Sequence, residues 1–277
     1  MTITPYQCSV HTHTTLCDGK GTPEEMAASA YASGVKYYGF SGHSFSPNPM
    51  DFGYNLPPDT SEYRRKVLAL REEYAGRMEI LLGIEWDSWT EGDPEGYDYW
   101  IGSVHALRDA QGGYYAVDAG PETFTECRDK VFHGDVMSMA EAYYEGVAAM
   151  AARKPDILGH IDLITKYEER HAFLDQTNPR YRRAALDALH SVDPSATLLE
   201  INTGAMSRGW RTTPYPAPFI LDEWRRMGGR IIITADTHSP TTILYAYDKA
   251  IAAALAAGYK ESAVLTLNGV RECALRS

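Results

Sequence analysis

Six of the nine histidines in this 277-residue chain recur in short motifs spread along the sequence, together with three acidic residues. The nine candidates are His11, His13, Asp18, His43, Glu85, His105, His160, Asp236 and His238. Imidazole and carboxylate groups together are typical ligands of zinc, manganese and iron, whereas a thiolate-rich set would indicate a structural zinc. Nine ligands are too many for one ion. They predict a cluster of two or three divalent ions in which Glu85 bridges two of them.

Each of these motifs ends or follows a segment with the apolar pattern of a strand. The predicted strands are residues 7–13, 36–43, 79–85, 99–105, 157–160, 197–202 and 230–236. Residues two apart on a strand point to the same side, so His11 and His13 form a natural chelating pair. Any one histidine could be a core or surface residue, but six of them at strand ends, with acids, favour a metal site.

Helical patterns lie between the strands and indicate a parallel sheet wrapped by helices. They cover residues 61–74, 179–190, 218–227 and 242–257. Capping boxes predict two further helix starts, one at Thr22 with an end at Gly34 and one at Ser138. Seven strand–helix cycles without a linker or repeat predict one closed or nearly closed α/β barrel, with an open doubly wound sheet as the alternative. The chain lacks the Gly-rich nucleotide-binding motifs that usually accompany such an open sheet.

All strands of a parallel barrel end at the same face, so residues far apart in the sequence meet in one pocket there. Two long loops, residues 44–60 and 107–136, follow the second and fourth strands and could cover this face.

The composition excludes several classes of protein. A net charge of −11 and a pI near 5.3 argue against a surface that neutralises nucleic acid. No apolar stretch reaches the roughly 20 residues of a membrane span, and the N-terminus lacks the pattern of a signal peptide, so we expect a cytoplasmic protein. The four cysteines have no paired spacing and are expected to be reduced; Cys17, near the histidines, is expected to pack.

The motif series as a whole resembles that of the polymerase-and-histidinol-phosphatase (PHP) superfamily. The matching motifs are His11-Thr12-His13 with Asp18-Gly19, Gly42-His43-Ser44, Gly83-Ile84-Glu85, Gly102-Ser103-Val104-His105, Gly159-His160-Ile161-Asp162 and Ala235-Asp236-Thr237-His238-Ser239. Within the superfamily, Glu200-Ile201-Asn202-Thr203 and Tyr215-Pro216 are similar to the PHP-type histidinol-phosphatases. The resemblance extends from His11 to about Tyr259. It implies a single PHP domain over residues 1–277, with a distorted seven-stranded (β/α)7 barrel.

The resemblance also implies a trinuclear metal site and a substrate, L-histidinol phosphate, hydrolysed to L-histidinol and phosphate in histidine biosynthesis. One ion would be held by His11, His13, Glu85 and Asp236, a second by Glu85, His105 and His160, and a third by Asp18, His43 and His238. Many relatives have an acid just before the second-strand histidine, where this chain has Gly42. This departure leaves the ligand in place and affects only its surroundings.

Three divalent ions with three carboxylates and one bridging hydroxide would keep a charge of about +2, which favours a phosphate ester. The hydroxide would be the nucleophile, because metal binding brings the pKa of water to about 7. A general acid could be a metal-bound water, His238 or Asp236, and the sequence does not choose. Basic residues in the loops after strands five and six are candidates to bind phosphate. Arg208 matches the position in relatives best, and the others are Arg211, Lys166 and Arg170.

Three alternative functions remain open at this stage. They are a PHP phosphoesterase acting on nucleotides, oligonucleotides or another small ester, an amidohydrolase-type barrel, and a metal-binding protein without turnover. The acidic charge disfavours a polymeric nucleic-acid substrate. Loop residues Asp51, Tyr54, Glu168 and Trp86 are candidates to contact the histidinol group. The sequence does not distinguish zinc, manganese and iron, and it does not indicate an oligomeric state.

Overall fold

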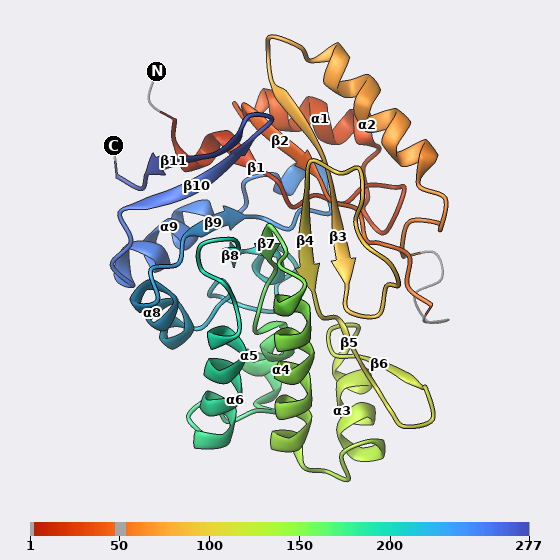
Figure 1. Cartoon of the computed structure of the whole chain (residues 1–277), viewed down its shortest axis with the longest axis vertical. Helices are drawn as coiled ribbons and strands as arrows, with labels where there is room; N and C mark the ends of the chain where they lie inside the picture. Colours follow the sequence, from red (N-terminus) through yellow and green to blue (C-terminus); the bar gives the residue numbers. More distant parts are fainter. Residues whose placement is uncertain (1–2, 48–53, 277) are drawn as a thin grey trace.

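The computed structural model describes residues 3–47 and 54–276, and at its centre lies a nine-stranded sheet that curls on itself (Figure 1). The strand order is β1-β2-β3-β4-β7-β8-β9-β10-β11, parallel from β1 to β10. The strands are β1 (Cys8–Ser9), β2 (Tyr37–Phe40), β3 (Glu79–Asp87), β4 (Tyr99–Ser103), β7 (Ile157–Leu158), β8 (Leu198–Asn202), β9 (Ile231–Thr234), β10 (Glu261–Thr266) and β11 (Gly269–Ala274). Seven of them overlap the seven predicted segments.

The last two strands, β10 and β11, were not predicted, and they form an antiparallel hairpin. Its turn at Leu267-Asn268 is followed by Gly269 with a φ of 103°, a glycine position that is common in short hairpins. β10 pairs with β9 at Ala263 and Ile232. The sheet therefore contains two more strands than the seven that were predicted.

The first and last predicted strands meet beyond the ends of β1 and β9. Thr12 and Thr237 form a parallel bridge, in which the Thr237 amide donates to the His11 carbonyl at 3.0 Å and the His13 amide donates to the Thr237 carbonyl at 2.9 Å. The segment after β1 thus neighbours the segment after β9, which is the geometry of a curled sheet and differs from that of an open doubly wound one.

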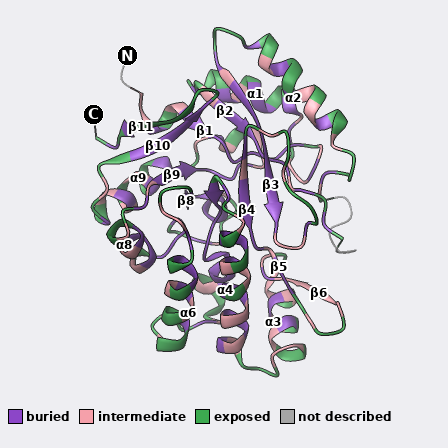
Figure 2. Ribbon diagram, in the orientation of Figure 1, coloured by how far each residue is buried: buried purple, intermediate pink, exposed green. Residues whose placement is uncertain are grey.

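Helices surround the sheet in Figure 1, and their outward faces hold many of the exposed residues, while the strands of the central sheet from β1 to β10 are mostly buried and β11 is mostly exposed (Figure 2). The α-helices are α1 (Pro23–Ala32), α2 (Ser61–Glu73), α3 (Pro121–Lys130), α4 (Val136–Ala152), α5 (Glu168–His171), α6 (Pro179–His190), α7 (Gly204–Ser207), α8 (Pro218–Arg226) and α9 (Tyr247–Ala256). None of the helices in the described part of the chain has the length and apolar character that crossing a bilayer requires.

Two helix starts and one loop differ from the predictions. Of the two helix starts predicted from capping boxes, that of α1 is confirmed, because the helix begins directly after Thr22. α4 begins at Val136, two residues before Ser138, because the Asp135 side chain accepts hydrogen bonds from the amides of Met137 and Ser138 and caps the helix earlier. α9 begins at Tyr247, since Ala246 has a φ of 54° that interrupts the predicted helix of residues 242–257. The predicted loop 107–136 contains α3 and the hairpin of β5 (Ala106–Arg108) and β6 (Tyr114–Ala116).

The inside of the curled sheet is a packed core beneath the strand ends. Val10, Tyr99, Ile101 and Ile232 belong to this inner cluster and are almost fully buried. The Tyr99 hydroxyl donates to the backbone carbonyls of Val10 and Phe40, which ties β4 to the first two strands across the interior. This core forms a rigid floor for side chains that project from the strand ends above it.

Candidate metal centre

The nine predicted ligands converge at the C-terminal ends of the parallel strands. Four overlapping groups have potential ligand atoms within 4.8 Å of one another: His13, Asp18, His43 and His238; His11, His13 and Asp236; His11, Glu85 and His160; and His43, Glu85 and His105. The backbone supports this meeting, because residue pairs Thr12–Thr237 and His43–Glu85 form parallel bridges beyond the regular strands. Residues up to 227 positions apart in the sequence are thereby held in one place.

Glu85 lies at the centre of the site, and its two carboxylate oxygens face different histidines. Oε2 lies within 3.4 Å of a nitrogen atom of each of three residues, His11, His13 and His43. Oε1 lies 3.0 Å from His160 Nε2 and 3.4 Å from His105 Nε2. A carboxylate whose oxygens address separate sets of imidazoles has the arrangement that a bridging ligand needs.

Asp18, from the loop after β1, gathers a second part of the site. Its Oδ2 atom lies 3.0 Å from His238 Nε2. Its Oδ1 atom lies 3.4 Å from His13 Nδ1 and 3.7 Å from His43 Nε2. In a tetrahedral zinc site with metal–ligand bonds of about 2.1 Å, any two ligand atoms lie about 3.4 Å apart. The separations in this part of the site are close to that value.

Several inward-facing atoms of the site are buried without a hydrogen-bond partner among the described residues. They are Nε2 of His11, Nε2 of His13, Oδ1 of Asp18 and Oε2 of Glu85. Buried polar atoms are rarely left unpaired, because each one loses its hydration without compensation. Since these atoms come from imidazoles and carboxylates and point at one another, the residues fit divalent metal ions.

The charges of the site are strongly coupled in the metal-free protein. Burial lowers the pKa of His11, but the carboxylates of Glu200 and Glu85 outweigh burial and hold that pKa well above its usual value. The pKa of His105 is likewise lowered by burial and raised by Glu85, with a net rise to about 10. Burial and the neighbouring His238 lower the pKa of His13 to about 3. Protons therefore balance part of the carboxylate charge where metal ions would otherwise do so.

The grouping of the ligands differs in detail from the three sets that the family resemblance implies. Asp18, His43 and His238 do lie together, and His13 lies with them as well as with His11 and Asp236. Glu85 lies with His160 and His11 on one side, and with His105 and His43 on the other. All nine residues share one site, while the assignment of each to a particular ion stays a prediction.

Among the four basic residues predicted to bind phosphate, Arg208 is the one that contacts candidate ligands in the described part of the chain. Its Nη2 donates to Asp236 Oδ2 at 2.9 Å, and its Nη1 lies 3.0 Å from His238 Nδ1. Arg211 is buried and donates to the backbone and hydroxyl oxygens of Thr165.

Arg170 and Lys166 hold neighbouring loop segments. Arg170 donates to the carbonyl of Gly209. The Lys166 ammonium donates to Asp118 at 2.7 Å (backbone) and 3.1 Å (Oδ2). Asp118 follows Val117, whose amide donates to the His105 carbonyl at 2.8 Å, and this places Asp118 and its partner Lys166 beside the site. Their role toward phosphate stays a prediction.

Three residues that were not predicted as site residues contact the ligands directly, although Glu200 and Ser103 belong to motifs of the family resemblance. Glu200 of β8 lies against His11, Asp87 accepts from the His105 amide and lies 3.1 Å from His105 Nδ1, and Ser103 donates to Glu85 Oε1 at 2.7 Å. One signal was visible for Glu200, a lone acid in the apolar segment Leu-Leu-Glu-Ile. Acids within buried strands usually have a partner.

Cys17 packs beside the site, as predicted. Its thiol is buried, and its sulfur lies 3.7 Å from His13 Nδ1. Burial is the main cause of its raised pKa, which keeps the thiol protonated at neutral pH.

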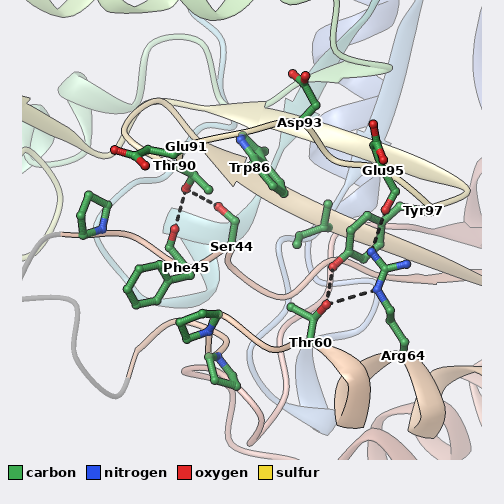
Figure 3. A pocket seen from close by; sticks show the side chains of 14 residues that line it. Ser44, Phe45, Thr60, Arg64, Trp86, Thr90, Glu91, Asp93, Glu95 and Tyr97 are labelled. Carbon is green, nitrogen blue, oxygen red and sulfur yellow. Dashed lines mark hydrogen bonds between the residues drawn. The ribbon is translucent and has the colours of Figure 1, made fainter.

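A hollow of about 430 Å³ lies next to the cluster on the outward side of β3 (Figure 3). Ile84 and Trp86 line it, and they flank Glu85, so they point to the opposite face of the strand. None of the nine candidate ligands lines this hollow. Trp86 therefore faces away from the metal centre, and Asp51, another candidate for contact with histidinol, lies outside the described residues.

Comparison with known proteins decides the family, since residues 8–204 match the PHP domain. The chain belongs to the PHP family. One relative of this PHP protein, from Deinococcus radiodurans, is named "Probable histidinol-phosphatase" and is 31% identical over 88% of this chain and 91% of its own. Another, from Bacillus subtilis, is named "Histidinol-phosphatase" and is 24% identical over 86% of this chain and 96% of its own.

A solved structure shares the fold of this PHP protein. It is the histidinol phosphate phosphatase of Lactococcus lactis in complex with zinc, L-histidinol and phosphate. The two structures superpose with a TM-score of 0.70 at 17% identity, over 96% of this chain and 99% of that chain. The similarity confirms an α/β fold with a curled, mainly parallel sheet.

Proposed function

We propose that this protein is a metal-dependent phosphomonoesterase that hydrolyses L-histidinol phosphate to L-histidinol and phosphate, a step of histidine biosynthesis. The observation that carries the proposal is the convergence of six imidazoles and two further carboxylates, those of Asp18 and Asp236, around Glu85. The names of the two curated relatives, and the zinc, L-histidinol and phosphate bound by the Lactococcus lactis protein, support the same reaction and substrate.

We propose that the nine converging residues hold two or three divalent ions, zinc, manganese or iron, with Glu85 shared between them. Such ions, when bound, supply positive charge for phosphoryl oxygens and lower the pKa of water enough for attack at neutral pH. The four unpaired inward-facing atoms of His11, His13, Asp18 and Glu85 support this proposal.

The residues of the chain contribute binding and proton transfer. Arg208 stands beside Asp236 and His238, and its planar guanidinium matches two phosphoryl oxygens, so we propose that it orients the phosphate. His238 and Asp236 are the candidates to pass a proton to the leaving oxygen. Arg211 donates to Thr165 and Arg170 donates to Gly209, and we propose that both support phosphate binding by holding the Arg208 loop. Lys166 donates to Asp118, and we propose that it supports phosphate binding from the neighbouring loop.

The proposal extends to the domain and its partners. We propose one PHP domain over residues 1–277, with the seven strands from β1 to β9 as a distorted (β/α)7 barrel to which β10 and β11 are added. The partner is a small phosphate ester, because a chain with a net charge of −11 is poorly suited to a nucleic-acid polymer.

Phosphate release by the metal-reconstituted protein tests this function. L-histidinol phosphate is compared with nucleoside monophosphates and an aryl phosphate at equal concentration, with chelator-treated protein as the control. We expect kcat/KM for L-histidinol phosphate to exceed the others by about 100-fold or more, because a site that binds both ends of a substrate rejects esters that leave its polar groups unpaired. Equal, slow hydrolysis of all esters would contradict the substrate and leave a general PHP phosphoesterase, including one for nucleotides.

A further inference from the structure

Glu200 is a buried carboxylate in the middle of β8 that has no place among the nine ligands. Its side chain is 0% exposed, and its neighbours on the strand are Leu199 and Ile201. A carboxylate is expensive to bury unless it is paired or hydrogen-bonded. The partners of Glu200 therefore indicate what it does.

Each of the two carboxylate oxygens of Glu200 has two hydrogen-bond partners. Oε1 lies 2.5 Å from His11 Nδ1 and accepts from the Thr234 hydroxyl at 2.7 Å. Oε2 accepts from the His160 amide at 2.7 Å and from Asn202 Nδ2 at 3.0 Å. The orientation of the Asn202 amide is settled by its other end, because Asn202 Oδ1 accepts from the Gly204 amide.

These contacts determine which nitrogen of His11 carries a proton. An ionised carboxylate has about four acceptor positions, and all four are filled, so Glu200 has no room for a proton of its own. The Thr234, His160 and Asn202 groups are donors, and His11 Nδ1 must donate as well. The lone pair of the neutral imidazole is then on Nε2, which lies 3.3 Å from Glu85 Oε2 and 3.6 Å from Asp236 Oδ1.

We propose that Glu200 is a positioning residue that holds His11 with its proton on Nδ1 and its Nε2 directed at the metal centre. This inference rests on the proposed metal site. A carboxylate that accepts from the far nitrogen of a metal-binding histidine fixes the ring and makes it a better ligand.

The second oxygen of Glu200 extends this control to other parts of the site. Its bond from the His160 amide fixes the backbone of a second candidate ligand. Its bond from Asn202 orients the amide that holds Gly204, the first residue of α7, which leads to Arg208. One buried carboxylate thus aligns two imidazoles and the turn that carries the proposed phosphate-binding arginine.

Glu200→Gln in the full-length protein is the main test. The amide keeps the size of the side chain, but one of its two oxygens becomes an NH2 group that donates. The two donors that face this NH2 group, either His11 with Thr234 or His160 with Asn202, then lose their acceptor. We expect zinc affinity, measured by competition with a chromophoric chelator, to fall by about 10- to 100-fold while the circular dichroism spectrum is unchanged. Unchanged zinc affinity would overturn the proposal.

Asp87→Asn is the matched variant, because Asp87 contacts the Nδ1 atom of a different histidine, His105. Nitrogen–proton correlation spectra of the zinc-loaded proteins report the two rings separately. We expect Glu200→Gln to shift the Nδ1–H signal of His11 and speed its exchange with water, and Asp87→Asn to alter the His105 signal and leave that of His11. A His11 Nδ1–H signal with unchanged chemical shift and exchange rate in Glu200→Gln would contradict the proposed role.

The metal-free wild-type protein provides a second test, in which a variant serves only to assign the signal. His11 carries a proton on Nδ1 there whether the ring is charged or neutral, so its Nδ1–H signal, assigned by its absence in His11→Asn, is expected. Its absence from the wild type would overturn the proposal. A protein that shows this signal and binds zinc but leaves L-histidinol phosphate intact would overturn the proposed function and not the role of Glu200.

Discussion

Asp236 shows how much of the site depends on the charge of a single side chain. Its Oδ1 lies 3.4 Å from His13 Nε2, while its Oδ2 accepts from Arg208. Burial raises the pKa of Asp236, but Arg208 and His11 outweigh burial and hold it well below its usual value. Its φ of 44° lies in the left-handed region, which Asp and Asn tolerate better than other side chains.

Asp236→Asn is therefore expected to remove activity and preserve the fold. Asparagine suits the same backbone conformation, so the change is confined to the charge. Loss of one anionic ligand is expected to raise the activation free energy by several kcal/mol, which lowers kcat by about 1000-fold. Steady-state kinetics and thermal melting check this, with the exposed Arg183→Gln as control. Full activity of Asp236→Asn with the wild-type metal content would contradict the proposed ligand set. The variant His13→Ala is expected to lose activity in the same way.

At the scale of elements, the short helix α7 controls how closely Arg208 approaches Asp236. A Cβ atom on Gly204 would lie 2.5 Å from Asp236 Oδ2 and 2.9 Å from Arg208 Nη2. Contacts this short do not occur for real Cβ atoms, so the ion pair requires glycine at the start of α7. The turn after β8 is thereby fitted to the residue that follows β9.

Gly204→Ala should accordingly disrupt the Arg208–Asp236 pair. We expect kcat/KM to fall by about 10-fold or more, since a displacement of about 1 Å at a reacting site can cost about 100-fold. Gly146→Ala on α4 is the matched control, because its Cβ would meet no atom closer than 3.5 Å. That variant should keep its activity and gain about 0.5–1 kcal/mol of stability. Equal activity of the two variants would show that the close approach at Gly204 has no functional role.

For the whole molecule, the metal-free cluster links stability to pH. The pKa of His105 is lowered by burial and raised by Glu85 to about 10. A folded-state pKa above the unfolded value of about 6.5 stabilises the fold fully below pH 6.5, and this contribution is lost as pH rises toward 10. The raised pKa values of His11 and His43 act in the same direction. A bound ion replaces these protons and removes the dependence.

Metal removal should therefore destabilise the protein more at pH 8.5 than at pH 6.5. With free zinc at about 1000 times its Kd, one site adds about 4 kcal/mol, which corresponds to a rise in Tm of about 8 °C. Differential scanning calorimetry of zinc-loaded and chelator-treated protein at both pH values measures this difference. A difference in Tm that shrinks at the higher pH would contradict the linkage between protons and metal ions.

Local signals were sufficient for much of the fold. The seven parallel strands and the start of α1 follow from apolar runs and from the capping box at Thr22, because such patterns act over a few residues. The start of α4 was misplaced because the prediction rested on the capping box at Ser138, whereas the Asp135 side chain accepts hydrogen bonds from the first amides of the helix. The β10–β11 hairpin was not predicted, although each of its strands has six residues, because it lies beyond the last ligand motif at Asp236-Thr237-His238.

The sequence by itself determined the kinds of ligand and the end of the sheet at which they meet, because every candidate ends or follows a predicted parallel strand. Only the tertiary structure decided which atoms face one another. It directs the two oxygens of Glu85 to different histidines, and it fills the four acceptor positions of Glu200 with donors that include His11. Of the four predicted basic residues, it brings Arg208 into contact with the candidate ligands in the described part of the chain. These contacts join residues far apart in the chain, and they depend on how the sheet curls and on close packing around buried charge, which no local pattern records.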